Sequence, residues 1–466
     1  MVERPQHDTG HMSQFEALLW RLDADPRLSS TIANLTILDT TPDWRRLRTR
    51  LDRAAAAIPR LRQRIVETLG GLAPPRWIPD AGFDIDRHVR RVTLKGHRSQ
   101  RAMLDMAMEL FAEPLDRSRP LWDFVVIEGM VDGRAAMLQR LHHAVTDGIG
   151  GLRISEQFID LERNAAEPPP IESPPTVDVP GFLDSVTETV AHLSRHQLDL
   201  LRQRSDRARE WLTNPGSLLG STARGIDLIR STARQARVTE SRLSPLWRQR
   251  SLERRLDLID VSLVAAKEGG RLLGGSVNDF FVTGVLAGAA EYHRRAGMPV
   301  EALRVAMPVS TRGSDRSAGG NLFAPTQTVL PAGDLSPTER FAQVHELLAR
   351  TREEPAVGAV EPLAAALNLL PHPLLVWAGY RTSSAVDFVT SNIRAAPFDI
   401  YLAGALMEGN YPIGPLAGTA FNLTTMSYRG SLNMGLVTDT AAVEEPKLLA
   451  SCIEGAYREL LVAAGL

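Results

Sequence analysis

Six prolines divide this chain of 466 residues into two parts. They lie within residues 164–180, which read NAAEPPPIESPPTVDVP. Proline cannot supply the backbone N–H that sheets use and it holds the chain extended, so this segment is predicted to be a linker. One hydrophobic core rarely serves more than about 250–300 residues. We therefore expect a first domain over residues 1–163, a linker and helical connection over 164–245, and a second domain over 246–466.

The charge balance and the cysteine content exclude several classes of protein. The chain has 53 basic and 55 acidic side chains, which leave a formal charge of −2. Nucleic-acid binding needs a basic excess, so no nucleic-acid partner is expected. Cys452 is the sole cysteine. Because no intrachain disulfide can form, a reducing compartment such as the cytoplasm fits best.

No segment is expected to span a membrane. The N-terminus, MVERPQHDTGHMSQFE, lacks the apolar region of a signal peptide. The longest apolar stretch, residues 362–380, is cut by Pro371 and Pro373 into pieces too short for a bilayer. Residues 182–213 have the spacing of an amphipathic helix with many arginines, which fits either a helix packed on the protein or one at a membrane surface. The protein is predicted to be soluble or peripherally membrane-associated.

Apolar spacing and β-branched residues predict a mixed α/β first domain, with helical and strand-like segments again in the second. Pro59 is expected to end or kink the first of the helices. The predicted elements are a helix over 44–68, a strand over 88–94, a helix over 100–110, a strand over 122–127 and a helix over 446–463.

The motif HHAVTDG, residues 142–148, is predicted to form a strand-to-helix turn. The preceding RAAMLQRLHH is typical of a strand that leaves the core, and Ile149, Leu152 and Ile159 then share one face of a helix. Side chains at such a turn reach the edge of a cleft. Gly148 would supply an unusual backbone dihedral there.

Adjacent strand residues point to opposite faces, so His142 and His143 are predicted to have different roles. One imidazole would face the substrate as a general base, for which an ordinary histidine pKa of ~6.5 is well suited, and the other would be buried. Asp147 would hold the turn through local backbone bonds or pair with an arginine. A metal site is disfavoured because opposite faces make a poor chelate. A purely structural histidine pair is the other alternative.

HHAVTDG resembles the HHxxxDG signature of the CoA-dependent acyltransferase superfamily. PLDRSRPLWDF at 114–124 and SVNDFFVTGVLAGAA at 276–290 are similar to two motifs of one branch, the bacterial wax ester synthase/diacylglycerol acyltransferase family. Shorter similarities extend over nearly the whole chain, at residues 77–92, 307–312, 319–321 and 427–428.

The resemblance implies an α/β fold with mixed sheets, in which two chloramphenicol-acetyltransferase-like domains enclose a tunnel that reaches the histidine motif from both sides. It implies acyl-CoA as co-substrate, a lipid alcohol as acceptor and no permanently bound cofactor. The predicted reaction is O-acyl transfer that forms triacylglycerol or wax ester at a membrane or lipid-droplet surface. The predicted catalytic residues are His143, which corresponds to the family's catalytic second histidine, and Asp147. The predicted substrate-binding residues are His142, Gly148, Asn278 and Asp279.

Several of these residues also have a structural interpretation. Asn278, or a backbone amide near it, is our candidate oxyanion donor, yet Asn278 and Asp279 fit a helix cap equally well. Trp122 is predicted to be a core anchor, because large aromatic side chains are usually buried. Asn392 and Ser427 would line the acceptor channel or stabilise turns.

The chain departs from the family pattern at three places. SNIRAAP at 391–397 lacks the usual Gly-Pro turn, Glu16 replaces the usual aspartate, and Phe280 and Phe281 would narrow the tunnel if they faced it. Acceptor preference is therefore not carried over. The alternatives are acyl transfer to a polyketide or peptide acceptor, and a lipid-binding protein without turnover.

Overall fold

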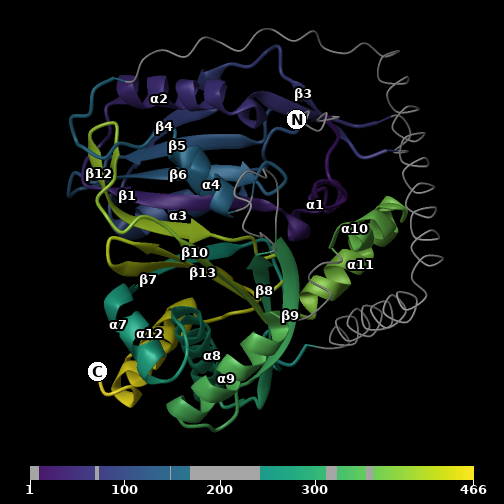
Figure 1. Cartoon of the computed structure of the whole chain (residues 1–466), viewed down its shortest axis with the longest axis vertical. Helices are drawn as coiled ribbons and strands as arrows, with labels where there is room; N and C mark the ends of the chain where they lie inside the picture. The colour runs from purple at the N-terminus through teal and green to yellow at the C-terminus, as the bar shows by residue number, and fades with distance from the viewer. Residues whose placement is uncertain (1–9, 69–72, 147, 168–241, 311–322, 353–359) are drawn as a thin grey trace, which may run out of the picture.

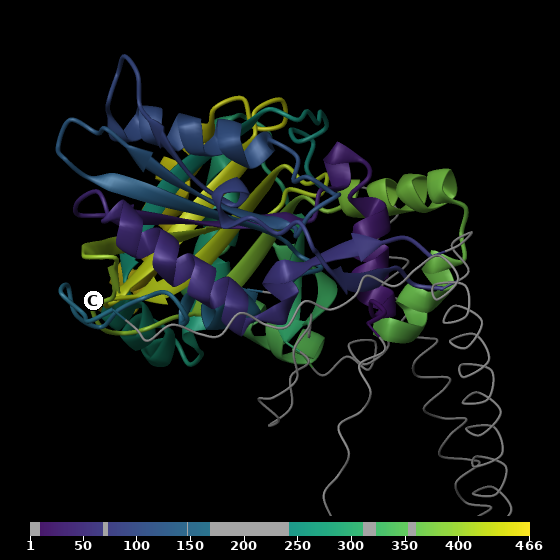
Figure 2. The ribbon, with the colours of Figure 1, turned by 90° about the horizontal axis from the view of Figure 1, so that it is seen from above.

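The computed structural model of this chain describes residues 10–68, 73–146, 148–167, 242–310, 323–352 and 360–466. Figure 1 shows the two six-stranded sheets one above the other in the middle of the molecule. Seen from above in Figure 2, the strands of the two sheets cross over one another. The predicted α/β fold with mixed sheets and two domains is confirmed.

The first sheet combines strands from both halves of the chain. The strand at its centre, β1, pairs antiparallel with β6 on one side and with β12 on the other. β4 and β5 pair in parallel, which makes the sheet mixed. Its strands, in spatial order, are β11 (Tyr401–Leu402), β12 (Ala405–Ile413), β1 (Thr31–Leu38), β6 (Ala135–His142), β5 (Trp122–Glu128) and β4 (Val89–Thr93).

The second sheet contains the remaining long strands. β10 lies parallel to both β8 and β13, and the other pairs are antiparallel. In spatial order its strands are β7 (Arg254–Ser262), β14 (Ser431–Asp439), β13 (Phe421–Tyr428), β10 (Phe388–Arg394), β8 (Ala302–Ser310) and β9 (Phe323–Pro331).

Close approach of the two sheets depends on a residue without a side chain. A Cβ atom on Gly435 of β14 would lie 2.2 Å from the carbonyl oxygen of Pro412 on β12. A real Cβ atom cannot lie so close to an oxygen atom. Glycine at this position therefore allows β14 of the second sheet to contact β12 of the first sheet.

Helices pack on both faces of the first sheet and on one face of the second, because each buries one apolar stripe. Those of the first half are α1 (Gln14–Leu22), η1 (Pro26–Leu28), α2 (Trp44–Ala57), η2 (Pro59–Arg62), η4 (Ile85–Arg87), α3 (Gln100–Ala112) and α4 (Gly148–Ser155). Those of the second half are α7 (Leu263–Leu272), α8 (Val277–Arg295), α9 (Pro337–Arg352), α10 (Val360–Asn368), α11 (His372–Ser384) and α12 (Pro446–Ala463).

The helix predicted over 44–68 is too long at its C-terminal end. α2 ends at Ala57, before Pro59, and residues 63–66 form β2 instead. β2 (Gln63–Val66) pairs antiparallel with β3 (Arg76–Pro79), a contact that helical spacing does not reveal. The predicted linker and the helix over 182–213 lie outside the described residues, apart from residues 164–167.

Among the described residues, no single helix has both the length and the apolar character to cross a bilayer. Only α7 and α8 taken together meet the length and composition test, and these two helices are bent by 94° relative to each other.

Candidate functional site

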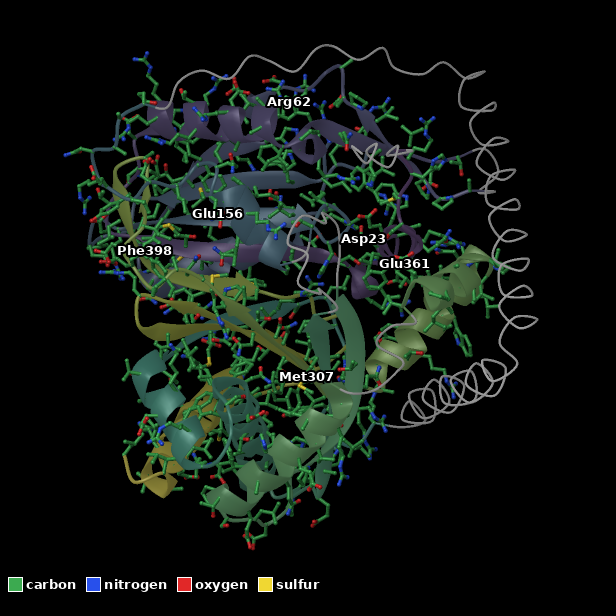
Figure 3. All side chains as sticks on the ribbon, in the orientation of Figure 1. Asp23, Arg62, Glu156, Met307, Glu361 and Phe398 are labelled. Atoms are coloured by element: carbon green, nitrogen blue, oxygen red, sulfur yellow. The ribbon has the colours of Figure 1, made fainter. Side chains whose placement is uncertain are left out.

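A cavity of about 690 Å³ lies between the two sheets. Most of its wall is apolar and comes from both halves of the chain. Glu156, Met307 and Phe398, which are labelled in Figure 3, line it from the segment after α4, from β8 and from the segment after β10. Such an apolar space between two sheets suits a long hydrocarbon chain.

His143 lines this cavity at the end of β6. The strand ends at His142, α4 begins at Gly148, and the predicted strand-to-helix turn is therefore present. The backbone N–H of His143 donates to the carbonyl of Ser30 at 2.8 Å, which ties the turn to the start of β1. The imidazole is half-buried, at a place where it can meet a molecule in the cavity.

His142 faces away from the cavity and is 1% exposed. Its Nδ1 accepts the backbone N–H of Ala144 at 3.0 Å, and its Nε2 lies 3.6 Å from Oδ2 of Asp23. Trp20 approaches the ring edge-on. The two histidines thus have the different surroundings that strand alternation predicts.

Asp23 is the C-cap residue of α1, and its carboxylate also lies 3.6 Å from Nη1 of Arg117. Burial alone would raise the pKa of its carboxyl group, but the adjacent His142 and the N–H of Ser30 outweigh burial and lower that pKa. Asp23 thus lies beside the buried histidine and accepts the N–H of Ser30 at 2.8 Å, which links the end of α1 to the start of β1 next to the turn.

A polar cluster that the sequence analysis did not identify lies in the cavity wall. Asn34, Gln139 and Asn410 all line the cavity. The Asn34 side-chain amide donates to Asn410, Thr36 donates to Asn410 at 3.0 Å, and Gln139 donates to Thr36 at 3.3 Å. Asparagine is disfavoured inside strands, so Asn34 within TIANLTIL was a usable signal for this cluster.

The start of α8 has a capping arrangement. Ser276 is the N-cap residue, and its side chain exchanges hydrogen bonds with Asp279. Asp279 is fully buried and also lies 2.8 Å from Nδ1 of His345 on α9. Asp279 is not among the described residues that line the cavity. The cap interpretation therefore explains its contacts.

Asn278 is one residue removed from the cavity wall. Its Oδ1 accepts from Nδ2 of Asn392 at 3.3 Å, and Asn392 lines the cavity, whereas Asn278 and Ser427 are absent from its described lining. Asn278 therefore reaches the cavity only through Asn392. Asp147 lies outside the described residues.

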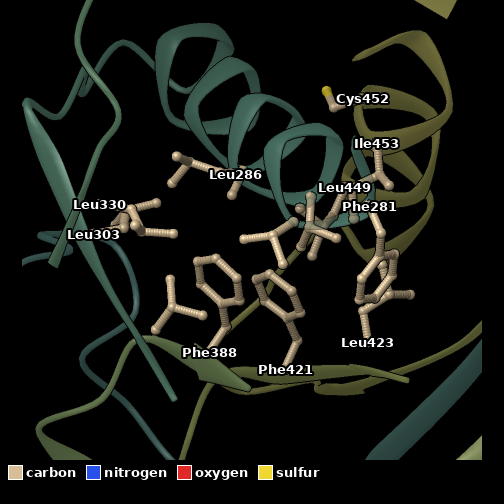
Figure 4. Packing of buried hydrophobic residues seen from close by; sticks show 14 of the residues in the cluster. Phe281, Leu286, Leu303, Leu330, Phe388, Phe421, Leu423, Leu449, Cys452 and Ile453 are labelled. Atoms are coloured by element: carbon tan, nitrogen blue, oxygen red, sulfur yellow. The ribbon is translucent and has the colours of Figure 1, made fainter. Parts of the chain in front are cut away.

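The aromatic residues of the motifs belong to the core. Phe280 and Phe281 are fully buried and pack within the second domain, so they do not narrow the cavity; Figure 4 shows Phe281 among its neighbours. Trp122 is 2% exposed, and its Nε1 donates to the carbonyl of Leu61 at 2.8 Å. Its predicted place in the core is confirmed.

The described residues include no candidate metal-binding site. No set of three or more His, Cys, Asp or Glu side chains among them is placed to hold an ion. Cys452 is buried on α12, and burial raises the pKa of its thiol. A buried thiol with a raised pKa is a poor nucleophile.

Comparison with known proteins finds matches over most of the chain. Residues 12–281 match the family model of the wax ester synthase/diacylglycerol acyltransferase catalytic domain, and residues 319–461 match that of the WS/DGAT C-terminal domain. A Mycobacterium tuberculosis protein named "putative diacylglycerol O-acyltransferase" is 36% identical over 461 residues, which cover 96% of this chain and 91% of that protein. A second one, from the same strain, is 28% identical and covers 96% of each chain.

Solved structures share the fold. The wax ester synthase/diacylglycerol acyltransferase from Marinobacter aquaeolei VT8 aligns with a TM-score of 0.62 at 19% identity, over 98% of this chain and 100% of that one. The starter condensation domain of rhizomide synthetase, a mutant in complex with C8-CoA, aligns with a TM-score of 0.58 at 14% identity, over 98% and 94% of the two chains.

Proposed function

This chain belongs to the wax ester synthase/diacylglycerol acyltransferase family, and from that premise we propose that it transfers the acyl group of an acyl-CoA to the hydroxyl group of a lipid alcohol. The acceptor is a diacylglycerol or a fatty alcohol, and the product is triacylglycerol or wax ester. The chain is thus an acyltransferase, and the proposal concerns its donor, its acceptor and its catalytic residue.

The observation that supports this proposal most is the place of His143. It lines a cavity of about 690 Å³ whose wall is mostly apolar and comes from both sheets. An acyl chain and a lipid alcohol are both apolar except at the reacting groups. A mostly apolar cavity whose lining also includes a histidine, several amides and hydroxyls, and the charged Glu156 and Arg394, suits such a pair.

In the proposed reaction, the imidazole of His143 takes the proton of the acceptor hydroxyl as its oxygen attacks the thioester carbonyl carbon. The tetrahedral intermediate then expels the CoA thiolate as the C–S bond breaks. The imidazolium returns the proton to this sulfur, so the enzyme ends unchanged and the ester is released. His142 and Asp23 hold the turn, and we assign the same task to Asp147 and Gly148.

We place the reaction at a membrane or lipid-droplet surface, with the protein bound peripherally. Both the acceptor and the product are apolar, so transfer through water is costly. A peripheral protein gains access to such molecules without a membrane span.

An acceptor panel tests the proposal. The protein is incubated with one long-chain acyl-CoA and with diacylglycerol, with fatty alcohol or without acceptor, and esters and free CoA thiol are measured. We expect ester only when a lipid alcohol is present, and none with the His143→Ala variant. Ester from a peptide or polyketide acceptor alone would contradict the assigned acceptor. Lipid binding without ester, in the wild type as in the variant, would contradict turnover itself.

A further inference from the structure

Helices α10 and α11 carry large apolar side chains on the surface. Leu363 is 50% exposed, Leu369 85%, Leu374 46% and Trp377 57%. In both overall views the two helices lie at one edge of the molecule (Figure 1, Figure 2). Leu374, Trp377 and Arg381 follow each other at helical spacing, so α11 presents one continuous exposed stripe. We call the four apolar residues and Arg381 the α10–α11 surface.

The charge of this segment suits a negatively charged lipid surface. Residues 362–386 contain no acidic side chain, and Arg381 is their only arginine or lysine. The preceding Glu361 is engaged, because its carboxylate accepts the backbone N–H groups of Gln14 and Phe15 at 3.0 and 3.3 Å. An exposed tryptophan with leucines and an arginine is typical of a helix that lies in a lipid interface.

A basic pocket of about 200 Å³ adjoins α11. Arg27, Arg250 and Arg254 line it, and the carboxylate of Asp439 lies in the same wall. Asp439 accepts from the N–H and hydroxyl of Ser251, both at 2.7 Å, and from the N–H of Ala441 at 3.0 Å. Arg27 is also paired with Asp25, whose carboxylate accepts from its Nε at 2.9 Å and from its Nη2 at 2.6 Å, so the excess of positive charge in the described lining comes from Arg250 and Arg254 against Asp439.

Arg250 and Arg254 are incompletely paired, because each has a buried nitrogen without a hydrogen-bond partner among the described residues. Arg250 donates to the carbonyls of Gly418 and Trp247, each at 2.6 Å, while its buried Nη2 has no hydrogen-bond partner among the described residues. Burial, with repulsion from Arg242, lowers the pKa of Arg250 to about 10. Burial also lowers the pKa of Arg254. An anion in the pocket would offset this unfavourable burial of charge.

The pocket and the α10–α11 surface both adjoin the large cavity. Thr419 lines both the pocket and the cavity. On α11, Gly379 and Ser383 line the cavity, whereas Tyr380 lines the pocket beneath the guanidinium of Arg27, which lies 4.2 Å from the centre of the ring. One helix therefore contacts the apolar cavity, the basic pocket and solvent.

We propose that the α10–α11 surface binds an anionic lipid layer, with the phosphate of a lipid headgroup held by Arg27, Arg250 and Arg254. This inference rests on the proposed function, because it identifies the side from which the lipid alcohol reaches the cavity. The ligand chemistry is a phosphate ester, which acyl-CoA also carries, so the test separates these two sources.

The first experiment tests the apolar part of the surface. Flotation with phosphatidylglycerol vesicles is compared for the wild type, for the double variant Leu374→Glu, Trp377→Glu and for Val462→Glu, an apolar site on α12 that is still more exposed. We expect the double variant to bind at least tenfold more weakly and Val462→Glu to bind as the wild type does. Equal binding by all three would overturn the proposal.

The second experiment tests the pocket. Arg27→Gln and Arg254→Gln are each compared with Arg248→Gln, an exposed arginine outside the pocket lining. We expect each pocket variant to bind phosphatidylglycerol vesicles about fivefold more weakly, with binding to phosphatidylcholine vesicles and to soluble acyl-CoA unchanged. Weaker binding of acyl-CoA with unchanged vesicle binding would assign the pocket to the CoA phosphates and overturn the proposal.

Residues 182–213, which have the spacing of an amphipathic helix, are an alternative membrane anchor, and deleting them tests that alternative. Loss of flotation on this deletion, together with full flotation of the Leu374→Glu, Trp377→Glu variant, would also overturn the proposal. Vesicle binding requires no turnover, so an absence of ester in the acceptor panel counts against the proposed function and leaves this test intact.

Discussion

Two helix starts in this molecule have sequence motifs that contain an aspartate, HHAVTDG at 142–148 and SVND at 276–279, yet the surroundings of the two motifs differ. The turn over residues 142–148 opens on the cavity through His143. The start of α8 over residues 276–279 is closed, because Asp279 is fully buried and shares its hydrogen bonds with Ser276 and His345. The first arrangement places an imidazole in the cavity wall, and the second uses its carboxylate inside the protein.

The difference shows that a motif's residue types do not reveal which way its side chains point. At the histidine turn, strand alternation places one ring on each face. At α8, the capping box draws the carboxylate back onto the backbone of its own helix. We therefore expect changes at the first place to affect catalysis and changes at the second to affect stability.

The largest expected effect is that of His143→Ala. Loss of a general base typically lowers the rate about 100-fold to 10,000-fold. Because the ring is half-buried beside a cavity, we expect the Tm to change little. Steady-state kcat with saturating acyl-CoA and thermal unfolding measure the two. A variant that keeps a tenth or more of the wild-type kcat would contradict the role of His143.

Asp279→Ala should destabilise the protein by about 2–3 kcal/mol, because a buried carboxylate that accepts several hydrogen bonds is removed. Urea unfolding measures this loss, and His345→Gln, which removes one partner, serves as the milder comparison. We expect kcat of the folded fraction to stay within about twofold of the wild type. A large loss of kcat at unchanged stability would show that the two helix starts act alike.

Asp23→Asn should produce a loss of stability that depends on pH. The pKa of Asp23 is lowered in the folded protein, so its ionised form stabilises the fold above the ordinary value of 3.8, and this contribution disappears as the pH falls through the folded-state pKa. We expect the variant to be less stable by about 1.5 kcal/mol at pH 7 and the difference to shrink toward pH 3. Urea midpoints across this range test it; a difference that stays constant with pH would show that the charge of Asp23 does not contribute to stability.

The smallest effect is expected for Ser276→Ala. Loss of an N-cap serine typically costs about 1 kcal/mol, and no change in kcat or KM is expected because the residue does not line the cavity. Thermal unfolding and the acceptor panel measure both. Ser276→Thr keeps the hydroxyl and should restore most of the stability.

Local sequence predicted much of the fold. The helix predicted over 446–463 is α12, and the strands and helix predicted between 88 and 127 are β4, α3 and β5, because these segments have strong periodicity. β2 was missed, since its strand character depends on pairing with β3. Likewise, nothing local indicates that β12 pairs with β1, which is more than 360 residues away in the sequence.

The candidate site was predicted in part. Strand alternation led from sequence to the two different histidines, and His143 does line the cavity. Asn410 and Gln139 could not be found in this way, because their hydrogen bonds are to Asn34 and Thr36 of β1, which are distant from both in the sequence. Asn278, which is expected at the substrate, is not among the described residues that line the cavity, but its Oδ1 accepts from Asn392, which does line it.

The amino-acid sequence alone determined the α/β class, the strand-to-helix turn of HHAVTDG and the family, because periodicity and motif spacing are properties of short segments. The tertiary structure alone decided which side chains line the cavity and which serve as caps, and it brought the arginines at positions 27, 250 and 254 into one pocket. The physical reason is that burial and pairing are set by strands and helices that meet from distant parts of the chain.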